Sequence, residues 1–100
     1  MTVFAVEYIY AENSSELRNE YRPAHREFLG QHLAEDSAVR ILASGPTPSN
    51  DRALLIMQAE TQEALEAMLA QDPFAVHGAV AETVVNTWNP VTGLLSDFAW

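Results

Sequence analysis

Apolar residues occur along this chain in short runs separated by polar segments, and four of these runs predict β-strands. The run Val3–Tyr10 (VFAVEYIY) is almost continuously apolar and rich in β-branched and aromatic residues, which is typical of a buried strand. Three further runs predict strands over 39–44, 53–59 and 82–88. A short segment that opens with Gly45-Pro46 ends the second strand, so the second and third strands are expected to form an antiparallel hairpin.

Two stretches between the strands have helical character. In the first, Asn13-Ser14-Ser15-Glu16 offers an N-cap followed by a glutamate three positions later, which indicates a helix start. Pro23 interrupts the pattern, and we expect it in the first turn of a second, longer helix over 23–35, where its missing N–H is harmless. The apolar stripe of that helix consists of Phe28, Leu29 and Leu33.

The last helix is predicted to follow Thr61, which is a suitable N-cap. Its buried face consists of Leu65, Met68 and Leu69. Asp72-Pro73 is expected to stop it, because proline disfavours helical geometry in the residue before it.

The resulting order, β-α-β-β-α-β, predicts an α+β domain of the ferredoxin-like type. In this arrangement a four-stranded antiparallel sheet carries two helices on one face. The other face would expose apolar side chains, either Phe4, Val6 and Tyr8 or their alternates. We therefore expect a homodimer in which two sheets pack face to face or close into a barrel, with the apolar tail 89–100 adding to the interface.

Composition narrows the function classes. At 100 residues and 48% hydrophobic content, the chain is expected to form one domain over 1–100, with a small hydrophobic core. The absence of cysteine excludes disulfides, thiolate zinc sites and cysteine nucleophiles. The formal charge of −9, with no lysine, argues against binding to nucleic acid or to anionic lipid surfaces. No run suggests a signal peptide or a membrane span, so we expect a soluble, cytoplasmic protein.

Three of the five arginines, Arg18, Arg22 and Arg26, follow one another at a spacing of four residues. The ordinary interpretation is a solvated helix face with ion pairs to neighbouring glutamates, namely Glu16, Glu20 and Glu27. The alternative is that one of them, Arg22 above all, faces a pocket and holds an anionic group of a substrate.

A histidine and an aspartate stand beside prolines in two short phrases, Arg22-Pro23-Ala24-His25 and Asp72-Pro73-Phe74. Brought together by the fold, they would form a general acid/base pair, because a carboxylate orients and stabilises an imidazole. Taken alone, each has a structural interpretation, as a helical histidine and a turn aspartate. Gly45, after Ser44, would let the backbone approach a ligand or bend after the strand.

A metal site is not expected. His25 and His32 are seven residues apart, whereas two ligands of one metal on a helix are usually three or four apart. His77 lies in a loop, and no cofactor-binding motif accompanies these histidines. We therefore expect neither a metal nor a cofactor.

Three phrases together resemble the YciI-like (YCII-related) family: Arg22-Pro23-Ala24-His25, the strand end Ile41–Pro46 (ILASGP), and Asp72-Pro73-Phe74 followed by Gly78. The resemblance runs from the first strand to Trp88, which makes 1–88 the core of the domain and 89–100 an apolar extension. It implies the dimeric ferredoxin-like α+β barrel, with His25 and Asp72 as a catalytic dyad. It also implies a substrate cleft, to which we assign Arg22, Ser44, Gly45, Pro46 and Phe74.

This resemblance favours a small cofactor-free enzyme, a lyase or an isomerase. His25 would move a proton on a small cyclic or aromatic substrate, Asp72 would fix its tautomer, and Arg22 would hold a phenolate or carboxylate. Some YciI-like proteins are associated with dehydrochlorination of hydroxylated aromatics, and similar folds host muconolactone-type isomerases. The alternative is a non-catalytic dimer that binds a small ligand or a partner protein. A monooxygenase of the antibiotic-biosynthesis type would leave the histidine and aspartate phrases unexplained.

Overall fold

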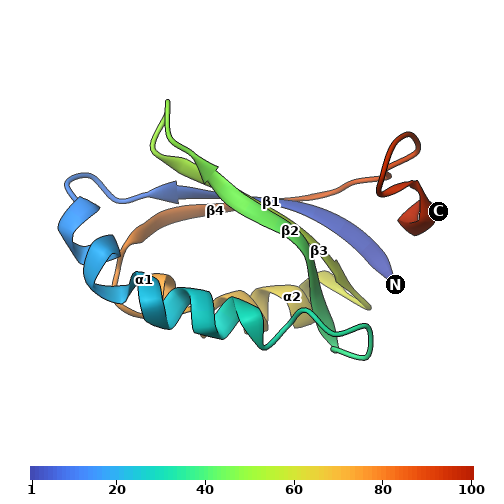
Figure 1. Ribbon diagram of the computed structural model, residues 1–100, viewed down its shortest axis with the longest axis horizontal. Helices are drawn as coiled ribbons and strands as arrows, with labels where there is room; N and C mark the ends of the chain where they lie inside the picture. Colours follow the sequence, from blue (N-terminus) through green and yellow to red (C-terminus); the bar gives the residue numbers. More distant parts are fainter.

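Four antiparallel strands form one sheet, and helices cover one of its faces (Figure 1). The computed structural model describes all residues, 1–100. The strands are β1 (Thr2–Tyr10), β2 (Val39–Thr47), β3 (Arg52–Ala59) and β4 (Val80–Thr87), in the sheet order β2-β3-β1-β4. The helices are α1 (Ser15–Gly30), α2 (Gln62–Leu69), the short α3 (Pro73–Val76) and a 3-10 turn, η1 (Ser96–Phe98). The predicted α+β, ferredoxin-like fold is confirmed.

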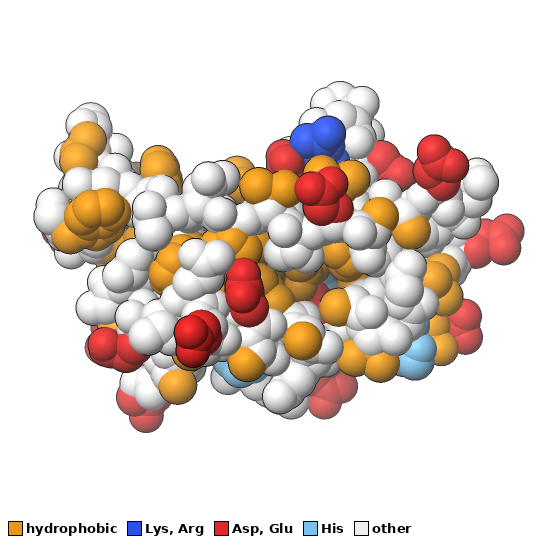
Figure 2. Space-filling view, turned by 180° about the vertical axis from the view of Figure 1, so that it is seen from behind, with side chains coloured by type: hydrophobic (Ala, Val, Ile, Leu, Met, Phe, Trp, Pro, Cys, Tyr) orange, Lys and Arg blue, Asp and Glu red, His pale blue; other side chains and the backbone are white.

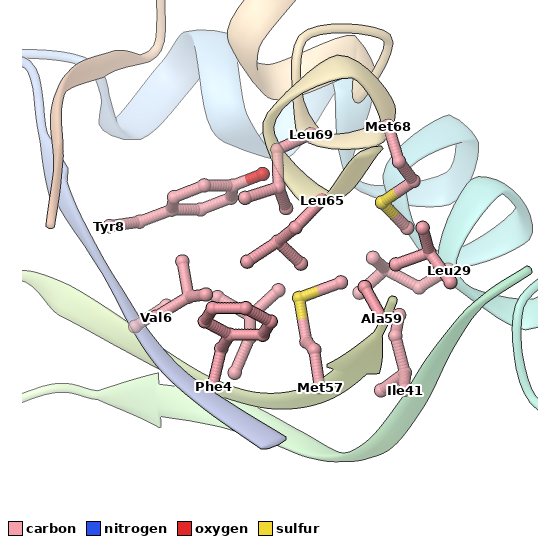
Figure 3. Close-up of a cluster of buried hydrophobic side chains, with 13 residues drawn as sticks. Phe4, Val6, Tyr8, Leu29, Ile41, Met57, Ala59, Leu65, Met68 and Leu69 are labelled. Carbon is pink, nitrogen blue, oxygen red and sulfur yellow. The ribbon is translucent and has the colours of Figure 1, made fainter. Parts of the chain in front are cut away.

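The inner strand β1 contributes one face of side chains to the core between the sheet and the helices. Phe4, Val6 and Tyr8 alternate along β1 and belong to the buried core, as strand geometry requires of one face. Figure 3 shows them with side chains of α1 and α2, and the Tyr8 hydroxyl points toward the helices. The core cluster is completed by Leu29, Val39, Ile41, Ala53, Leu55, Met57, Ala59, Leu65, Met68 and Leu69.

The β1 residues that lie between these three point to the opposite face of the sheet, which no helix covers (Figure 1). This face is mixed rather than purely apolar. On this face, the Glu7 carboxylate accepts a hydrogen bond from Arg52 at 2.9 Å. Leu54, which lies opposite Glu7 in the strand register, is 42% exposed on the same face.

A single helix, α1, replaces the two helices predicted around Pro23. The prediction that Pro23 starts a helix over 23–35 is wrong, because α1 runs through it from Ser15 to Gly30. Proline removes one helical N–H donor, but Pro23 is exposed, so water can bind the carbonyl that the donor would have served. Leu33 accordingly lies outside the helix and is 57% exposed, and only the earlier part of the predicted stripe is packed.

Strand β2 does not end at Ser44 as predicted but continues through Gly45 and Pro46 to Thr47. It is an edge strand, where a proline without an N–H is tolerated. The register against β3 shifts after Ile41, so that Leu42 is the extra residue of a bulge. The bulge reverses the alternation of side chains along the second half of the strand.

The segment around Asp72 begins a helix as well as following one. Thr61 caps α2 as predicted, accepting from the Ala64 N–H at 3.1 Å, and α2 ends at Leu69. Asp72 is then the N-cap of α3, with Pro73 at the first helical position, where its missing N–H is tolerated.

The tail beyond Trp88 folds back beside the end of the sheet that carries the N-terminus (Figure 1). The Asn89 side chain donates to the Trp100 carbonyl at 3.3 Å and accepts from the Trp100 N–H at 3.0 Å. Hydrophobic side chains gather on this projecting tail, at the left of Figure 2, and Leu94 is fully exposed there. No helix in the structure has the length and apolar character that a bilayer crossing requires.

Candidate active site

His25 and Asp72, 47 residues apart in sequence, are in direct contact. His25 comes from the middle of α1 and Asp72 from the start of α3. The His25 Nδ1 lies 2.8 Å from Asp72 Oδ1 and 3.0 Å from Oδ2. The aspartate side chain is completely buried, whereas that of His25 is 13% exposed. The two residues therefore form a pair with one member at a surface and the other behind it.

Two further donors surround the Asp72 carboxylate. The Tyr8 hydroxyl donates to Oδ2 at 2.8 Å, and the Phe74 backbone N–H donates to Oδ1 at 3.0 Å. The turn interpretation of Asp72 thus holds, since it caps α3, but the same carboxylate also binds His25. An ionised carboxylate only accepts, so the neutral imidazole carries its proton on Nδ1 and leaves Nε2 with a free lone pair.

Tyr8 was not predicted as a site residue. Burial, reinforced by the neighbouring Asp72 carboxylate, raises the pKa of Tyr8 well above its ordinary value. The phenol therefore remains a donor to Asp72 throughout the physiological pH range. A signal was present in the sequence, because a tyrosine on the buried face of an apolar strand needs a hydrogen-bond acceptor inside the protein.

Two parallel ring stacks join α1 to α3. Phe74 stacks on His25 with ring centroids 4.0 Å apart and planes 3° from parallel. One helical turn earlier on α1, Tyr21 stacks on His77 at 3.7 Å and 8°. The first stack holds the start of α3, and with it Asp72, against the helix that carries His25, and the second holds the end of α3 against the same helix.

A cavity of about 270 Å³ opens beside His25, between α1 and the sheet. All the residues predicted for the substrate cleft line it with His25, namely Arg22, Ser44, Gly45, Pro46 and Phe74. Asp72 does not line it, because it lies behind the imidazole, and Tyr8 contributes to the wall.

The bulge in β2 explains how the Ser44–Pro46 segment reaches the cavity. Before the bulge, Ile41 pairs with Met57 and belongs to the core face. After it, Ser44 pairs with Leu55 and Pro46 with Ala53, and both partners are core residues. Without the extra residue, the strand period of two would place Ser44 and Pro46 on the uncovered face.

Three arginines of α1 line the same cavity, Arg18, Arg22 and Arg26. The predicted ion pairs with Glu16, Glu20 and Glu27 do not form, although Arg26 is exposed as that interpretation expected. Arg18 instead pairs with Asp51 at 2.7 Å, donates to Ser14 Oγ at 3.1 Å, and lies 4.2 Å from the Tyr10 ring centroid. The regular spacing of the three arginines raised the alternative that one of them, Arg22 above all, faces a pocket, and the structure places Arg18 and Arg26 in the same cavity wall.

Tyr10 lies between these arginines and the stacked rings. Its ring meets that of Phe74 edge to face at 5.9 Å. Burial raises the pKa of Tyr10, and the positive charges of Arg18 and Arg22 oppose this rise. The positive charges of Arg18 and Arg22 therefore act on Tyr10, which is part of the cavity wall.

The remaining histidines have structural contacts. His32 Nδ1 lies 3.2 Å from the Val39 carbonyl oxygen, and His77 takes part in the stack with Tyr21. No three histidine, aspartate or glutamate side chains gather in a way that could hold a metal ion.

Comparison with solved structures identifies proteins of the same fold. The chain is similar to 5-chloro-2-hydroxyhydroquinone dehydrochlorinase from Burkholderia phenoliruptrix, solved in complex with 2,5-dihydroxybenzoquinone. The identity is 25%, the match covers 87% of this chain and 93% of the other, and the TM-score is 0.75. An uncharacterised NIPSNAP domain protein from Burkholderia xenovorans shares the fold at 14% identity, with coverage of 90% and 94% and a TM-score of 0.53.

Sequence comparison defines the family. No curated protein matches the chain. The YCII-related domain matches residues 2–89, which span all four strands and the helices between them. The match includes the phrases that bring His25 and Asp72 together, and it ends where the C-terminal tail begins. The chain therefore belongs to the YCII-related domain family.

Proposed function

We propose that this protein is a cofactor-free enzyme, a lyase or an isomerase, that moves a proton on a small hydroxylated ring. The observation that carries the proposal is the contact of His25 Nδ1 with Asp72 at 2.8 Å beside a cavity. This contact leaves Nε2 as the imidazole nitrogen available to a ligand. A positioned base of this kind contributes about 10²–10⁴-fold to a rate.

In the proposed reaction, Nε2 accepts the proton of a ring hydroxyl, and the electron pair of the O–H bond remains on the oxygen. The imidazolium is stabilised by Asp72 and returns the proton to a ring carbon, which completes an isomerisation. In a dehydrochlorination, the protonated carbon is the one that bears chlorine. The imidazole, neutral again, then accepts the proton of a second hydroxyl, whose electron pair forms a C=O bond while chloride leaves with the electron pair of the C–Cl bond. The net result is loss of HCl, with no external oxidant or reductant.

The similarity to a dehydrochlorinase supports the choice of substrate class. That protein is named for a chlorinated hydroxyhydroquinone and was solved with a dihydroxybenzoquinone. In this chain, the cavity combines aromatic and aliphatic walls, Phe74 and Leu29 among them, with polar groups beside His25. A planar ring with several oxygens suits such a mixed surface.

We also propose that the protein is a homodimer formed through the uncovered sheet face. Leu54 is 42% exposed on that face, and Trp88 and Trp100 at its end are 40% and 69% exposed. Large apolar side chains gathered near one uncovered face are typical of an interface.

The test is a turnover screen over chlorinated hydroquinones, other phenols and lactones, with absorbance and chloride release as readouts. Wild type is compared with His25→Gln and with His32→Gln, a matched control because His32 lies outside the cavity. We expect His25→Gln to lower kcat by about 10²–10⁴-fold and His32→Gln to retain activity. Equal turnover in wild type and His25→Gln would exclude His25 as the base. Saturable binding with no turnover of any compound would favour the non-catalytic ligand-binding alternative.

A further inference from the structure

We propose that the ligand of this cavity carries a carboxylate in addition to its hydroxylated ring, and that Arg22 and Arg26 bind this carboxylate beside His25. The inference rests on the proposed function and adds to it the charge of the substrate. It distinguishes a ring acid from the neutral phenols and quinols that would otherwise suit the site.

Arg22 and Arg26 have no carboxylate partner within the protein. The sequence has 14 acidic residues and only five arginines, so carboxylates are available in excess. Arg18 and Arg52 each take one, Asp51 and Glu7 respectively. Arg22 and Arg26 take none, although glutamates flank both in the sequence.

The other contacts of these two arginines do not balance their charge. Arg22 donates only to the side-chain amide of Asn19, which is neutral. Arg26 makes no side-chain hydrogen bond or ion pair at all, and both line the cavity. A guanidinium offers several donors in a fixed plane that match the two oxygens of a carboxylate.

The spacing of the two arginines on α1 allows both to contact the same ligand. They are four residues apart, so they lie on one face of the helix at a separation of about 6 Å along its axis. His25 follows Arg22 by three residues and therefore shares that side of α1. A carboxylate held by the arginines would place the ring to which it is attached next to the imidazole.

Neighbouring charges do not cancel this positive region. Asp72, the carboxylate nearest to His25, is fully buried and already accepts from three groups, so it does not reach the arginines. Arg18 is neutralised by Asp51 and packs on Tyr10, so we assign it to the cavity wall rather than to the anion. The result is a cationic spot within a protein of formal charge −9.

The test compares two probes of nearly the same shape, the anionic 2,5-dihydroxybenzoate and the neutral 2,5-dihydroxybenzamide. Their affinities are measured by titration calorimetry at low ionic strength for wild type, Arg22→Gln, Arg26→Gln and the double variant. Because a hydrogen bond to a charged group is worth about 1.5–3 kcal/mol, we expect wild type to prefer the acid by at least about tenfold. The double variant should bind both probes about equally, because it loses much more affinity for the acid than for the amide. Arg40→Gln is the matched control, since Arg40 is outside the cavity and loses the same charge, and it should keep the preference.

The outcomes separate this inference from the proposed function. Equal affinity of wild type for the two probes, a preference that survives in the double variant, or no binding of either probe would overturn the carboxylate site. Thermal unfolding of each variant verifies that it is folded. If neutral hydroquinones are turned over as fast as their acids, the carboxylate site is wrong and the proposed function stands. If the acid is preferred but nothing is turned over, the proposed function is wrong and the carboxylate site stands.

Discussion

The hydroxyl of Tyr8 donates a 2.8 Å hydrogen bond to Asp72, the same carboxylate that binds His25 Nδ1. Tyr8 lies in β1, the strand in the middle of the sheet, and is fully buried. A buried side chain of the sheet therefore holds the carboxylate that contacts the imidazole. In this arrangement the Tyr8 hydroxyl is a positioning group, because it bonds to Asp72 and through it orients His25, although Tyr8 also forms part of the cavity wall.

Removing the Tyr8 hydroxyl tests this role. Tyr8→Phe leaves the Asp72 carboxylate with one donor fewer in a fully buried place, and we expect a loss of about 1–3 kcal/mol in the free energy of unfolding. Urea unfolding followed by circular dichroism measures it. Turnover should fall through kcat with KM little changed, because the ligand does not contact the lost hydroxyl. Tyr21→Phe serves as control, since its hydroxyl makes no hydrogen bond, and a similar loss in both variants would contradict a specific role for Tyr8.

Replacing Asp72 separates its two functions. Asp72→Asn retains an oxygen for the Phe74 N–H, so α3 keeps its cap, but its neutral amide no longer stabilises an imidazolium. We expect a fall in kcat of about 10²–10⁴-fold. Asp72→Ala should lose the cap as well and be less stable than the asparagine variant by about 1 kcal/mol. Kinetics and urea unfolding of both variants give the comparison; full activity in Asp72→Asn would show that the carboxylate charge is not needed.

Stability at alkaline pH should report the buried tyrosines. An unfolded tyrosine ionises near pH 10, whereas burial raises the pKa of Tyr8 in the folded protein. Above about pH 10 the unfolded chain therefore binds fewer protons than the native one, and stability falls as the pH rises. One such group contributes a slope of up to about 1.4 kcal/mol per pH unit. Urea unfolding between pH 8 and about 11 measures the slope, which should be shallower in Tyr8→Phe; an unchanged slope would argue against this assignment.

Two glycines near the site make a matched pair. A Cβ on Gly45 would meet no atom within 4 Å, so Gly45→Ala should change stability by no more than about 0.5 kcal/mol. Gly78, after α3, has φ +81°, and an alanine there should cost about 1–2 kcal/mol. Thermal unfolding of both variants tests this difference. Gly45 pairs with Leu54 and alternates with Ser44 and Pro46, so its added Cβ would point to the uncovered face, and we expect Gly45→Ala to leave KM unchanged.

The proposed homodimer makes a prediction about Leu54. A charged residue at position 54 on the uncovered face should oppose burial of this face against a second copy, so Leu54→Glu is expected to convert the dimer to a monomer. Light scattering coupled to gel filtration determines the mass of wild type and variant. Glu63→Gln, on the exposed surface of α2, is the control and should not alter the mass. A monomeric wild-type protein at micromolar concentration would contradict the dimer.

Local patterns in the sequence determined most of the fold. The alternation of apolar side chains placed four strands, Thr61 marked the start of α2, and the order of elements led to the ferredoxin-like sheet. These features depend on neighbours within a few residues, which is the range over which strand period and helix capping act. The family phrases also pointed to His25 and Asp72, which the fold brings into contact.

Other features depended on contacts between segments that are distant in sequence. Helix α1 continues through Pro23 because packing on α3, including the stack of His25 on Phe74, outweighs a local break. The bulge at Leu42 exists only in the register of β2 against β3, and no local pattern indicates it.

The site, like the fold, depends partly on local sequence and partly on contacts between distant segments. The sequence by itself determined that an imidazole and a carboxylate would be available on neighbouring elements. Only the tertiary structure decided that Tyr8 completes the hydrogen bonds of Asp72 and that all three arginines, Arg18, Arg22 and Arg26, line the cavity. The physical reason is that burial and charge pairing depend on which faces meet when the sheet and helices pack, and the chain alone does not specify this.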